Sequence, residues 1–348
     1  MLGIGSVVRL LALLFARHAP QTITRMALSD ASRSRLAEAV ASLPVRHHDD
    51  IEAFEEACGV AVEQSLTAEE RAKLREIFSS GGPACVHVKN LPVVAAGGTL
   101  PPTPNELMET MQPVTKEDAA SEAALVGTAA LVGARCFTYK NFYGGDFVRN
   151  FPRKQGAELG WHRDGVTAPP FRPPKQFFRD ETLVPELVLI FCLRGNAQAK
   201  TMIVDFSSLV SACDPSDVAL LRSEQLAFFD RQTGNTLEPI HVITGGDDAP
   251  LVELRPIERF EPRGDAAAVA AFERVYEVAE RVHERVCLSA GELLIVNNKR
   301  CSHARTPYAP KKRHVVDRWL QNVYASRATA LWENKEQSFV RWPARVVP

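Results

Sequence analysis

Two histidines and an aspartate form the pattern with the most chemical content in this chain. His162 and Asp164 are separated by one residue, and His303 follows much later in the sequence. In an extended segment residues i and i+2 point the same way, so His162 and Asp164 can meet one ion while Arg163 faces elsewhere. Two neutral imidazoles and a carboxylate are suitable ligands for Fe(II). They occupy one face of its coordination sphere and leave the other positions open. The sequence therefore predicts a metal site of the oxygenase kind.

A basic segment near the C-terminus changes how the His-Asp pair is interpreted. By itself, such a pair more often makes a structural hydrogen bond than a metal site. Residues 299–318, however, combine His303 with many cations opposed only by Asp317: Lys299, Arg300, Arg305, Lys311, Lys312, Arg313 and Arg318. Residues 311–313 are expected on a solvated surface. Arg318 opens an apolar strand, where a guanidinium needs a partner, and an anionic cosubstrate beside the metal would supply one.

The composition restricts the class of protein. The chain has 348 residues, 45% of them hydrophobic, and 41 Lys+Arg against 42 Asp+Glu give a net charge of −1. This length can bury a sizeable core, and the charge balance gives no indication of binding to nucleic acid or to an anionic membrane. The seven cysteines are scattered and lack a CxxC pair, which favours free thiols in a reducing compartment and a cytoplasmic protein.

The N-terminal residues are interpreted separately from the fold. Residues 10–16 are apolar but too short to span a bilayer, and neither a basic stretch nor a persuasive cleavage site accompanies them. We therefore expect residues 1–25 to be an extension outside the fold, with Met26 as an alternative start. The remaining residues, 26–348, are expected to form one domain.

Sequence patterning predicts helices first and strands afterwards. Residues 27–80 are expected to be helical, with a capping box at residues 67–70. A strand-rich core is expected over residues 84–325. Its predicted elements are a strand at 84–88, two buried strands at 186–193 and 201–205 that pair antiparallel across a turn at Gly195-Asn196, an amphipathic helix over 265–286, and strands at 291–296 and 318–324. His303 then follows a strand across the turn-forming Asn297-Asn298, where a rigid scaffold can deliver it to a pocket.

At these residues the chain resembles the Fe(II)/2-oxoglutarate-dependent oxygenases of the clavaminate synthase-like branch of the TauD group, which includes arginine and asparagine β-hydroxylases. The resemblance runs from about residue 86 to residue 324. The motifs that carry it are Leu159-Gly160-Trp161-His162-x-Asp164-Gly165, Pro185-Glu186-Leu187-Val188 through Leu193-Arg194-Gly195, Thr201, the segment 291–298, His303-x-Arg305-Thr306-Pro307-Tyr308 and Asp317-Arg318-Trp319-Leu320.

The resemblance implies a ligand set, cofactors and a fold. It makes His162, Asp164 and His303 the iron ligands, Arg318 the partner of the distal carboxylate of 2-oxoglutarate, and Thr201 a hydroxyl donor to the same cosubstrate. It implies a mainly β fold with flanking helices, a double-stranded β-helix or jelly roll. With Fe(II), 2-oxoglutarate and O2, enzymes of this group hydroxylate an unactivated carbon and release succinate and CO2.

Three features bear on the reaction and the substrate. Halogenating relatives carry a small residue where this chain has Asp164, so halogenation is not expected, whereas desaturation stays open. Residues 166–184 are rich in proline and aromatic residues, and we interpret them as a lid that excludes water rather than a plain surface loop. Asn322 lies four residues after Arg318, where close relatives often carry a second arginine for a carboxylate. Whether the substrate is free or carrier-bound is therefore open.

Four residues are candidates for substrate contact: Asn141, Arg255, Glu258 and Asn322. Arg255 and Glu258 belong to a region that supplies side-chain specificity in amino-acid hydroxylases, although their charges equally suit pairing with one another. The sequence thus predicts a dioxygenase that hydroxylates an amino acid or an amino-acid derivative, in specialised metabolism. Two rival classes are a zinc hydrolase, which gives Arg318 and Thr201 no role, and a non-catalytic sensor of a small anion.

Overall fold

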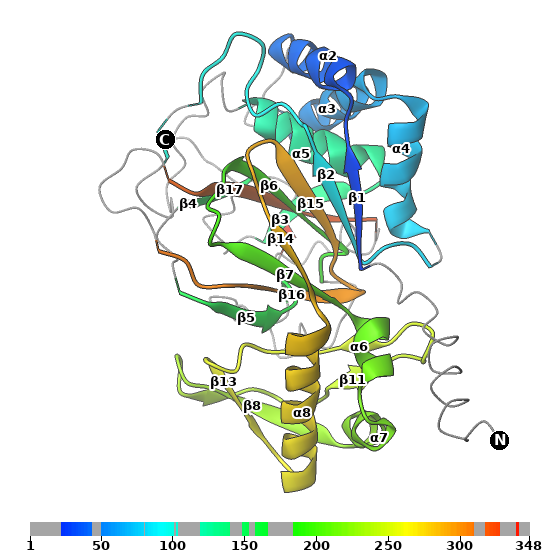
Figure 1. Ribbon diagram of the computed structural model, residues 1–348, viewed down its shortest axis with the longest axis vertical. Helices are drawn as coiled ribbons and strands as arrows, with labels where there is room; N and C mark the ends of the chain where they lie inside the picture. The colour runs from blue at the N-terminus through cyan, green and yellow to red at the C-terminus, as the bar shows by residue number, and fades with distance from the viewer. Residues whose placement is uncertain are drawn as a thin grey trace, which may run out of the picture.

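The computed structural model describes residues 22–43, 50–79, 81–100, 102–103, 119–139, 148–152, 157–165, 184–309, 317–327 and 339–340. Two β-sheets form its centre, with N-terminal helices above them and an insert of helices and short strands below (Figure 1). Among the described residues, no helix combines the length and the apolar character that crossing a membrane requires. A single oxygenase domain over residues 26–348 stays a prediction.

The larger sheet has eight described strands. Its path runs β1, β2, β15, β6, β17, β3, β18, and β4 pairs with β17 beside it. The strands are β1 Ile23–Ala27, β2 Cys85–Lys89, β3 Arg135–Tyr139, β4 Arg149–Pro152, β6 Leu187–Arg194, β15 Glu292–Asn297, β17 Trp319–Ser326 and β18 Phe339–Val340. The central strand β6 runs antiparallel to β15 on one side and to β17 on the other.

The smaller sheet carries both histidines of the predicted metal site. Its order is β14, β7, β16, β5, with bounds Glu284–Cys287, Lys200–Asp205, Cys301–Arg305 and Leu159–His162. All three neighbouring pairs are antiparallel. His162 at the end of β5 therefore lies directly opposite His303 in the middle of β16.

A shared apolar core lies between the two sheets. Val188 and Cys192 of β6 face it from the larger sheet, and Ile203 and Cys301 face it from the smaller one. The alternate β6 residues Leu187, Leu189 and Phe191 face the N-terminal helices instead. Both faces of β6 are thus buried, which explains why its sequence is a continuous apolar run without polar alternation.

The N-terminal helices cover the outer face of the larger sheet. They are α2 Asp30–Ala41, α3 Ile51–Ser65, α4 Ala68–Arg75, a single 3₁₀ turn Glu76–Phe78 and α5 Ala119–Leu131. The predicted capping box is confirmed, because Thr67 accepts from the Glu70 backbone and Glu70 accepts from the Thr67 backbone. The helix α5, which the sequence pattern does not reveal, contacts β6 and β17. Its residues 120–129 are almost completely buried, so it has no polar face to produce a helical period.

Close packing of α3 on α5 depends on Gly127. A Cβ added there would lie 2.4 Å from the carbonyl oxygen of Cys58 and 2.5 Å from a methyl carbon of Val62. We expect Gly127→Ala to lower the free energy of unfolding by about 1–2 kcal/mol, because overpacking outweighs the gain of about 1 kcal/mol in helix propensity. Urea unfolding measures the change in the free energy of unfolding. Gly246→Ala, whose Cβ would meet only the exposed Asp248 carboxylate, is the control; equal stability of both variants would contradict the packing argument.

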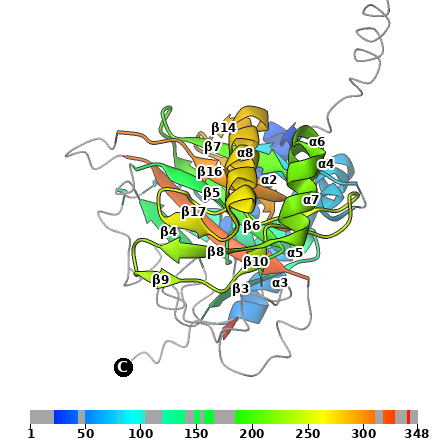
Figure 2. The same ribbon diagram turned by 90° about the horizontal axis from the view of Figure 1, so that it is seen from below.

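The insert between β7 and β14 covers the outer face of the smaller sheet. Figure 2 shows α8 and α7 in front of the sheets in the view from below. Its elements are α6 Phe206–Ala212, α7 Pro215–Ser223, β8 Gln225–Asp230, β9 Asn235–Thr236, β10 Ile240–His241, β11 Ile243–Thr244, β12 Leu251–Val252, β13 Phe260–Arg263 and α8 Ala266–Val282. Trp161, Met202 and Ala304 of the smaller sheet pack into the apolar core of the insert.

One strand pairing predicted from the sequence is wrong. The strands at 186–193 and 201–205 exist as β6 and β7, but they lie in different sheets. Both edges of β6 are occupied by β15 and β17, so no edge is left for β7. The Gly195-Asn196 connection therefore carries the chain from one sheet to the other instead of closing a hairpin.

Two boundaries also differ from the sequence-based expectation. The strand β1 begins at Ile23 and pairs in parallel with β2, so residues 23–25 belong to the fold and not to the expected extension. The helix predicted over 265–286 ends at Val282, where His283 is the C-cap. Val286 lies in β14 and faces the core between the sheets.

Candidate metal centre

The three residues predicted to bind metal converge between the two sheets. His162 ends β5, Asp164 lies in the turn after it, and His303 lies on β16. One ligand atom from each lies within 4.8 Å of the others, and His303 Nε2 is 3.3 Å from Asp164 Oδ2. The two imidazole rings have centroids 4.2 Å apart. The distant His303 and the local His-Asp pair thus form one cluster of possible ligands.

The protonation of this cluster suits a divalent metal. His162 Nδ1 lies 2.8 Å from the carbonyl oxygen of Gly160. A neutral His162 that donates its Nδ1–H to this oxygen keeps the lone pair of Nε2 available to bind a metal. Burial, reinforced by His303, lowers the pKa of His162 to about 4. Burial opposes ionisation of Asp164, but the hydrogen bond and charge of His303 hold its pKa well below the ordinary value. Metal binding needs neutral imidazole and ionised carboxylate, and His162 and Asp164 fit that requirement.

Asp164 is held in place by a tyrosine of the larger sheet and by an asparagine of the turn between β15 and β16. Tyr324 of β17 donates its hydroxyl to Asp164 Oδ1 at 2.9 Å. The side chain of Asn298, fully buried, accepts from the Asp164 backbone at 3.0 Å and donates to its carbonyl at 2.9 Å. Gly165 then takes a φ of +82°, which turns the chain away at a position that favours glycine. The sequence pattern does not reveal Tyr324 and Asn298 as positioning residues, although Tyr324 shares the strand face of Arg318.

We expect Tyr324→Phe to weaken Fe(II) binding by about tenfold, because the ligand carboxylate would lose its orienting hydroxyl. The phenyl ring would keep the packing of Arg149, whose guanidinium carbon lies 3.4 Å from the Tyr324 ring centroid. Competition titration with a fluorescent Fe(II) chelator measures the affinity, and urea unfolding checks the fold. An unchanged affinity would show that Asp164 needs no support from Tyr324.

Arg163 faces away from the possible ligands, as predicted. It donates to the carbonyl of Asn298 at 2.9 Å and forms a buried ion pair with Glu253 at 3.1 Å. Glu253 also lies 4.0 Å from Arg255. Arg255 is 2% exposed and stacks over the rings of Phe228 and Phe260 of the insert. Its role in substrate contact stays a prediction.

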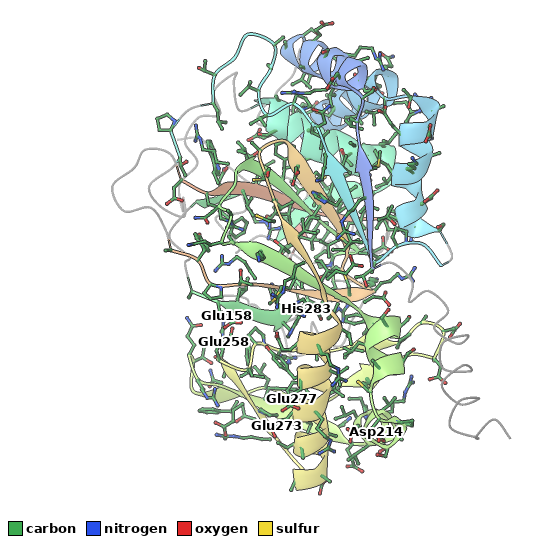
Figure 3. All side chains as sticks on the ribbon, in the orientation of Figure 1. Glu158, Asp214, Glu258, Glu273, Glu277 and His283 are labelled. Carbon is green, nitrogen blue, oxygen red and sulfur yellow. The ribbon has the colours of Figure 1, made fainter. Side chains whose placement is uncertain are left out.

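Glu258 contacts the strand that carries His162. It lies near Glu158, the residue before β5 (Figure 3), and accepts from the backbone N–H of Gly160 at 2.9 Å. The carbonyl of the same glycine is the partner of His162 Nδ1. A Cβ on Gly160 would lie 2.5 Å from the Glu258 carboxylate, so only glycine permits this approach. Glu258 thus supports the peptide that orients His162.

Two substitutions separate this supporting role from the predicted substrate contact. Glu258→Ala should reduce 2-oxoglutarate turnover by about tenfold because the Gly160 peptide loses its acceptor, and Glu258→Gln should restore most of it because the amide oxygen still accepts. Succinate production measures both variants. Equal damage from glutamine and alanine would favour a role for the negative charge, as in recognition of a cationic substrate.

Arg318 and Asn322 both point into the space between the sheets. Leu320 and Tyr324 of the same strand lie in the shared core, and Arg318 and Asn322 follow the same alternation. Arg318 is 6% exposed and Thr201, on β7, is 7% exposed. Across from Asn322, in register, β4 places Arg149, which is 2% exposed. The larger sheet therefore carries a second buried arginine close to the position where β17 lacks one.

Some predicted residues lie outside the described part of the chain. These are Asn141, residues 166–183 of the expected lid and the cations at 311–313. Their assignments stay predictions.

The fold and the cluster define a class, a β-sheet protein with a 2-His-1-carboxylate set of possible metal ligands between its sheets. The model of the taurine catabolism dioxygenase TauD, TfdA family matches residues 53–324, and the chain belongs to this family. An L-asparagine oxygenase from Streptomyces coelicolor is 27% identical over 258 residues, which cover 70% of this chain and 72% of that protein. An L-lysine 3-hydroxylase from Catenulispora acidiphila is 29% identical over 143 residues, and the match spans only 38% of its length and 37% of this chain.

Solved structures with the same fold agree with this assignment. An asparagine oxygenase in complex with Fe(II), 2S,3S-3-hydroxyasparagine and succinate superposes with a TM-score of 0.71 at 20% identity, covering 91% of this chain and 98% of that one. The non-heme iron oxygenase OrfP in complex with Fe and alpha-ketoglutaric acid gives a TM-score of 0.70 at 17% identity, covering 90% and 98%. At these identities the likeness concerns the fold.

Proposed function

We propose that this protein is an Fe(II)/2-oxoglutarate-dependent dioxygenase that hydroxylates an unactivated carbon of an amino acid or amino-acid derivative. The convergence of His162, Asp164 and His303 within 4.8 Å carries the proposal. A 2-His-1-carboxylate set is typical of non-haem Fe(II) oxygenases, and the chain belongs to a dioxygenase family. The two facing sheets are then the two halves of a double-stranded β-helix.

The residues around the cluster have separable roles in this function. His162, Asp164 and His303 would hold Fe(II), and Arg318 with Thr201 would hold the distal carboxylate of 2-oxoglutarate. When bound, Fe(II) with 2-oxoglutarate and O2 supplies the oxidising power that converts C–H to C–OH while succinate and CO2 are released. Asn298, Tyr324 and Glu258 fix the ligands, and burial of the cluster between two sheets limits the access of water.

The buried arginines make an anionic cosubstrate more consistent with this site than zinc-dependent hydrolysis. A zinc hydrolase would need the same ligands around a water, but it gives no reason to bury Arg318 beside them. An anionic oxo acid that chelates the metal and reaches a guanidinium uses both features. The positive charge of Arg318 is therefore part of the proposed function.

Arg149 supports a substrate that carries a free carboxylate. It lies in register with Asn322, and its charge lowers the pKa of Asp164, which places the guanidinium within electrostatic reach of the ligand cluster. We assign the substrate carboxylate to this arginine, which would do from β4 what a second arginine does from β17 in close relatives. A free amino acid then fits better than a carrier-bound one, because the thioester of a carrier would replace that carboxylate.

An anaerobic titration tests the function. Fe(II)-loaded protein should develop the weak visible charge-transfer band of chelated 2-oxoglutarate, and one amino acid of a panel should shift the band. Aerobic incubation with that amino acid should give succinate and a product heavier by one oxygen atom, whereas the corresponding amino-acid amide should bind more weakly. The absence of a band in folded, iron-loaded protein would overturn the proposal.

A further inference from the structure

A further buried arginine, Arg305, lies on β16, the strand that carries His303. On β16, Cys301 faces the core between the sheets and Ala304 faces the insert. Arg305, an even number of residues from Cys301, therefore points between the sheets like His303. Two residues of strand separate the two side chains by roughly 7 Å along β16. Arg305 is 8% exposed, and its register partner on β7 is Thr201.

Arg305 and Arg318 approach one another from opposite sheets. The guanidinium carbon of Arg305 lies 5.0 Å from the ring centroid of Tyr308, and that of Arg318 lies 5.3 Å from the same centroid. Two buried cations thus share one aromatic ring. Both guanidinium groups are buried, at 8% and 6% exposure, so little water screens the repulsion between these like charges.

Neither cation is neutralised within the described part of the chain. No described carboxylate forms a salt bridge with Arg305 or Arg318. Arg305 donates one N–H to the carbonyl of Ala157, but its buried Nε has no hydrogen-bond partner among the described residues. Burying two like charges together is costly unless an anion joins them. The pair therefore has the charge of an anion-binding site.

We propose that Arg305 is a second anchor for the distal carboxylate of 2-oxoglutarate and acts together with Arg318. This inference rests on the proposed function, because 2-oxoglutarate must be the cosubstrate. A carboxylate between two guanidinium groups gains charge-assisted hydrogen bonds from each, and it removes the repulsion between them. Arg305 is one strand repeat from His303, so a 2-oxo acid that chelates the metal reaches the arginine pair with a carboxylate at its other end. The pair selects 2-oxo acids with two carboxylates.

The test compares two 2-oxo acids that differ in the distal carboxylate. Anaerobic Fe(II)-loaded protein is titrated with 2-oxoglutarate and with 2-oxobutyrate, and the visible charge-transfer band gives each dissociation constant. In Arg305→Met we expect 2-oxoglutarate binding to weaken at least about tenfold while 2-oxobutyrate binding changes less than about twofold. Arg305→Lys, which keeps the charge and guards against misfolding of the methionine variant, should fall in between. Arg300→Met, the same change at the opposite end of β16, is the matched control and should bind both acids as the wild type does.

The outcomes separate this inference from the proposed function. If wild-type protein binds 2-oxoglutarate and Arg305→Met binds it equally well, the second anchor does not exist although the proposed function stands. If Arg305→Met weakens both acids by the same factor, Arg305 only supports the local structure through Ala157, and the inference is overturned. If wild-type protein forms no complex with 2-oxoglutarate, the proposed function fails and the inference falls with it.

Discussion

Replacing Asp164 with alanine should lower Fe(II) affinity by more than about 100-fold and abolish turnover. Asp164 supplies the only negatively charged ligand atom of the cluster. Its carboxylate lies 3.3 Å from the imidazole of His303, so the two side chains can bind the same ion. The variant would leave two neutral imidazoles, which bind a hard divalent ion much more weakly than a set that includes a carboxylate. Iron content after anaerobic reconstitution and succinate production after addition of 2-oxoglutarate measure the two losses.

Asp214→Ala is the matched control for that experiment. Asp214 lies at the far end of the insert from β5 (Figure 3), where it caps α7 by accepting from the Ser216 backbone. Loss of an N-cap costs about 1 kcal/mol of stability and should leave iron binding and turnover intact. Full activity of the Asp164 variant would refute the metal assignment, and equal loss in both variants would point to unfolding as the cause.

The sequence alone predicts this cluster because its members are tied to strand geometry. A histidine and an aspartate with one residue between them leave an extended segment on the same side, and His303 follows a run of apolar residues that is typical of a strand. The structure places these segments as β5 and β16 side by side, with His162 opposite His303. Residues whose type and spacing define their function can thus be predicted from the sequence.

The supporting residues could not be predicted in the same way. Asn298 looks like a turn residue, yet its side chain binds both the N–H and the carbonyl of Asp164 across a large distance in sequence. Glu258 looks like a surface charge or a substrate contact, yet it binds the Gly160 peptide from the insert. Their roles depend on which loops the two sheets bring together, and that information is tertiary.

The wrong strand pairing and the missed helix α5 have a related cause. The apolar runs of β6 and β7 indicate two strands, but a run that is buried on both faces contains no signal for its neighbours. The pairing is decided by β15 and β17, which come about a hundred residues later in the chain. The helix α5 is missed because burial on all sides removes the polar stripe on which a helical period depends.

The space between the sheets concentrates positive charge. Arg149, Arg305 and Arg318 are each at most 8% exposed and all belong to strands or strand ends next to the ligand cluster. Charged side chains are seldom buried to this extent without a functional or structural partner. In the proposed function, a substrate and a cosubstrate that both carry carboxylates would be such partners.

Replacing Arg318 with methionine should weaken 2-oxoglutarate binding by about 30- to 150-fold. A buried guanidinium that pairs bidentately with a carboxylate contributes about 2–3 kcal/mol, and methionine keeps the unbranched apolar stem of the side chain without the charge. At saturating 2-oxoglutarate the turnover number should fall much less than the apparent affinity, since in the proposed function Arg318 would contact the end of the cosubstrate away from the metal. Anaerobic titration of the charge-transfer band and steady-state kinetics measure the two quantities.

Arg327→Met provides the comparison at the other end of the same strand. Arg327 is half-exposed, pairs with Glu186 at 3.5 Å and stacks on Phe78, so it can lose its charge without touching the space between the sheets. An unchanged 2-oxoglutarate affinity in Arg318→Met would exclude this arginine as the anchor and would leave Arg305 as the guanidinium that must bind alone. A fall in turnover without a fall in 2-oxoglutarate affinity would instead mean that Arg318 positions the metal ligands. An arginine that contacts 2-oxoglutarate must contribute to the affinity for it.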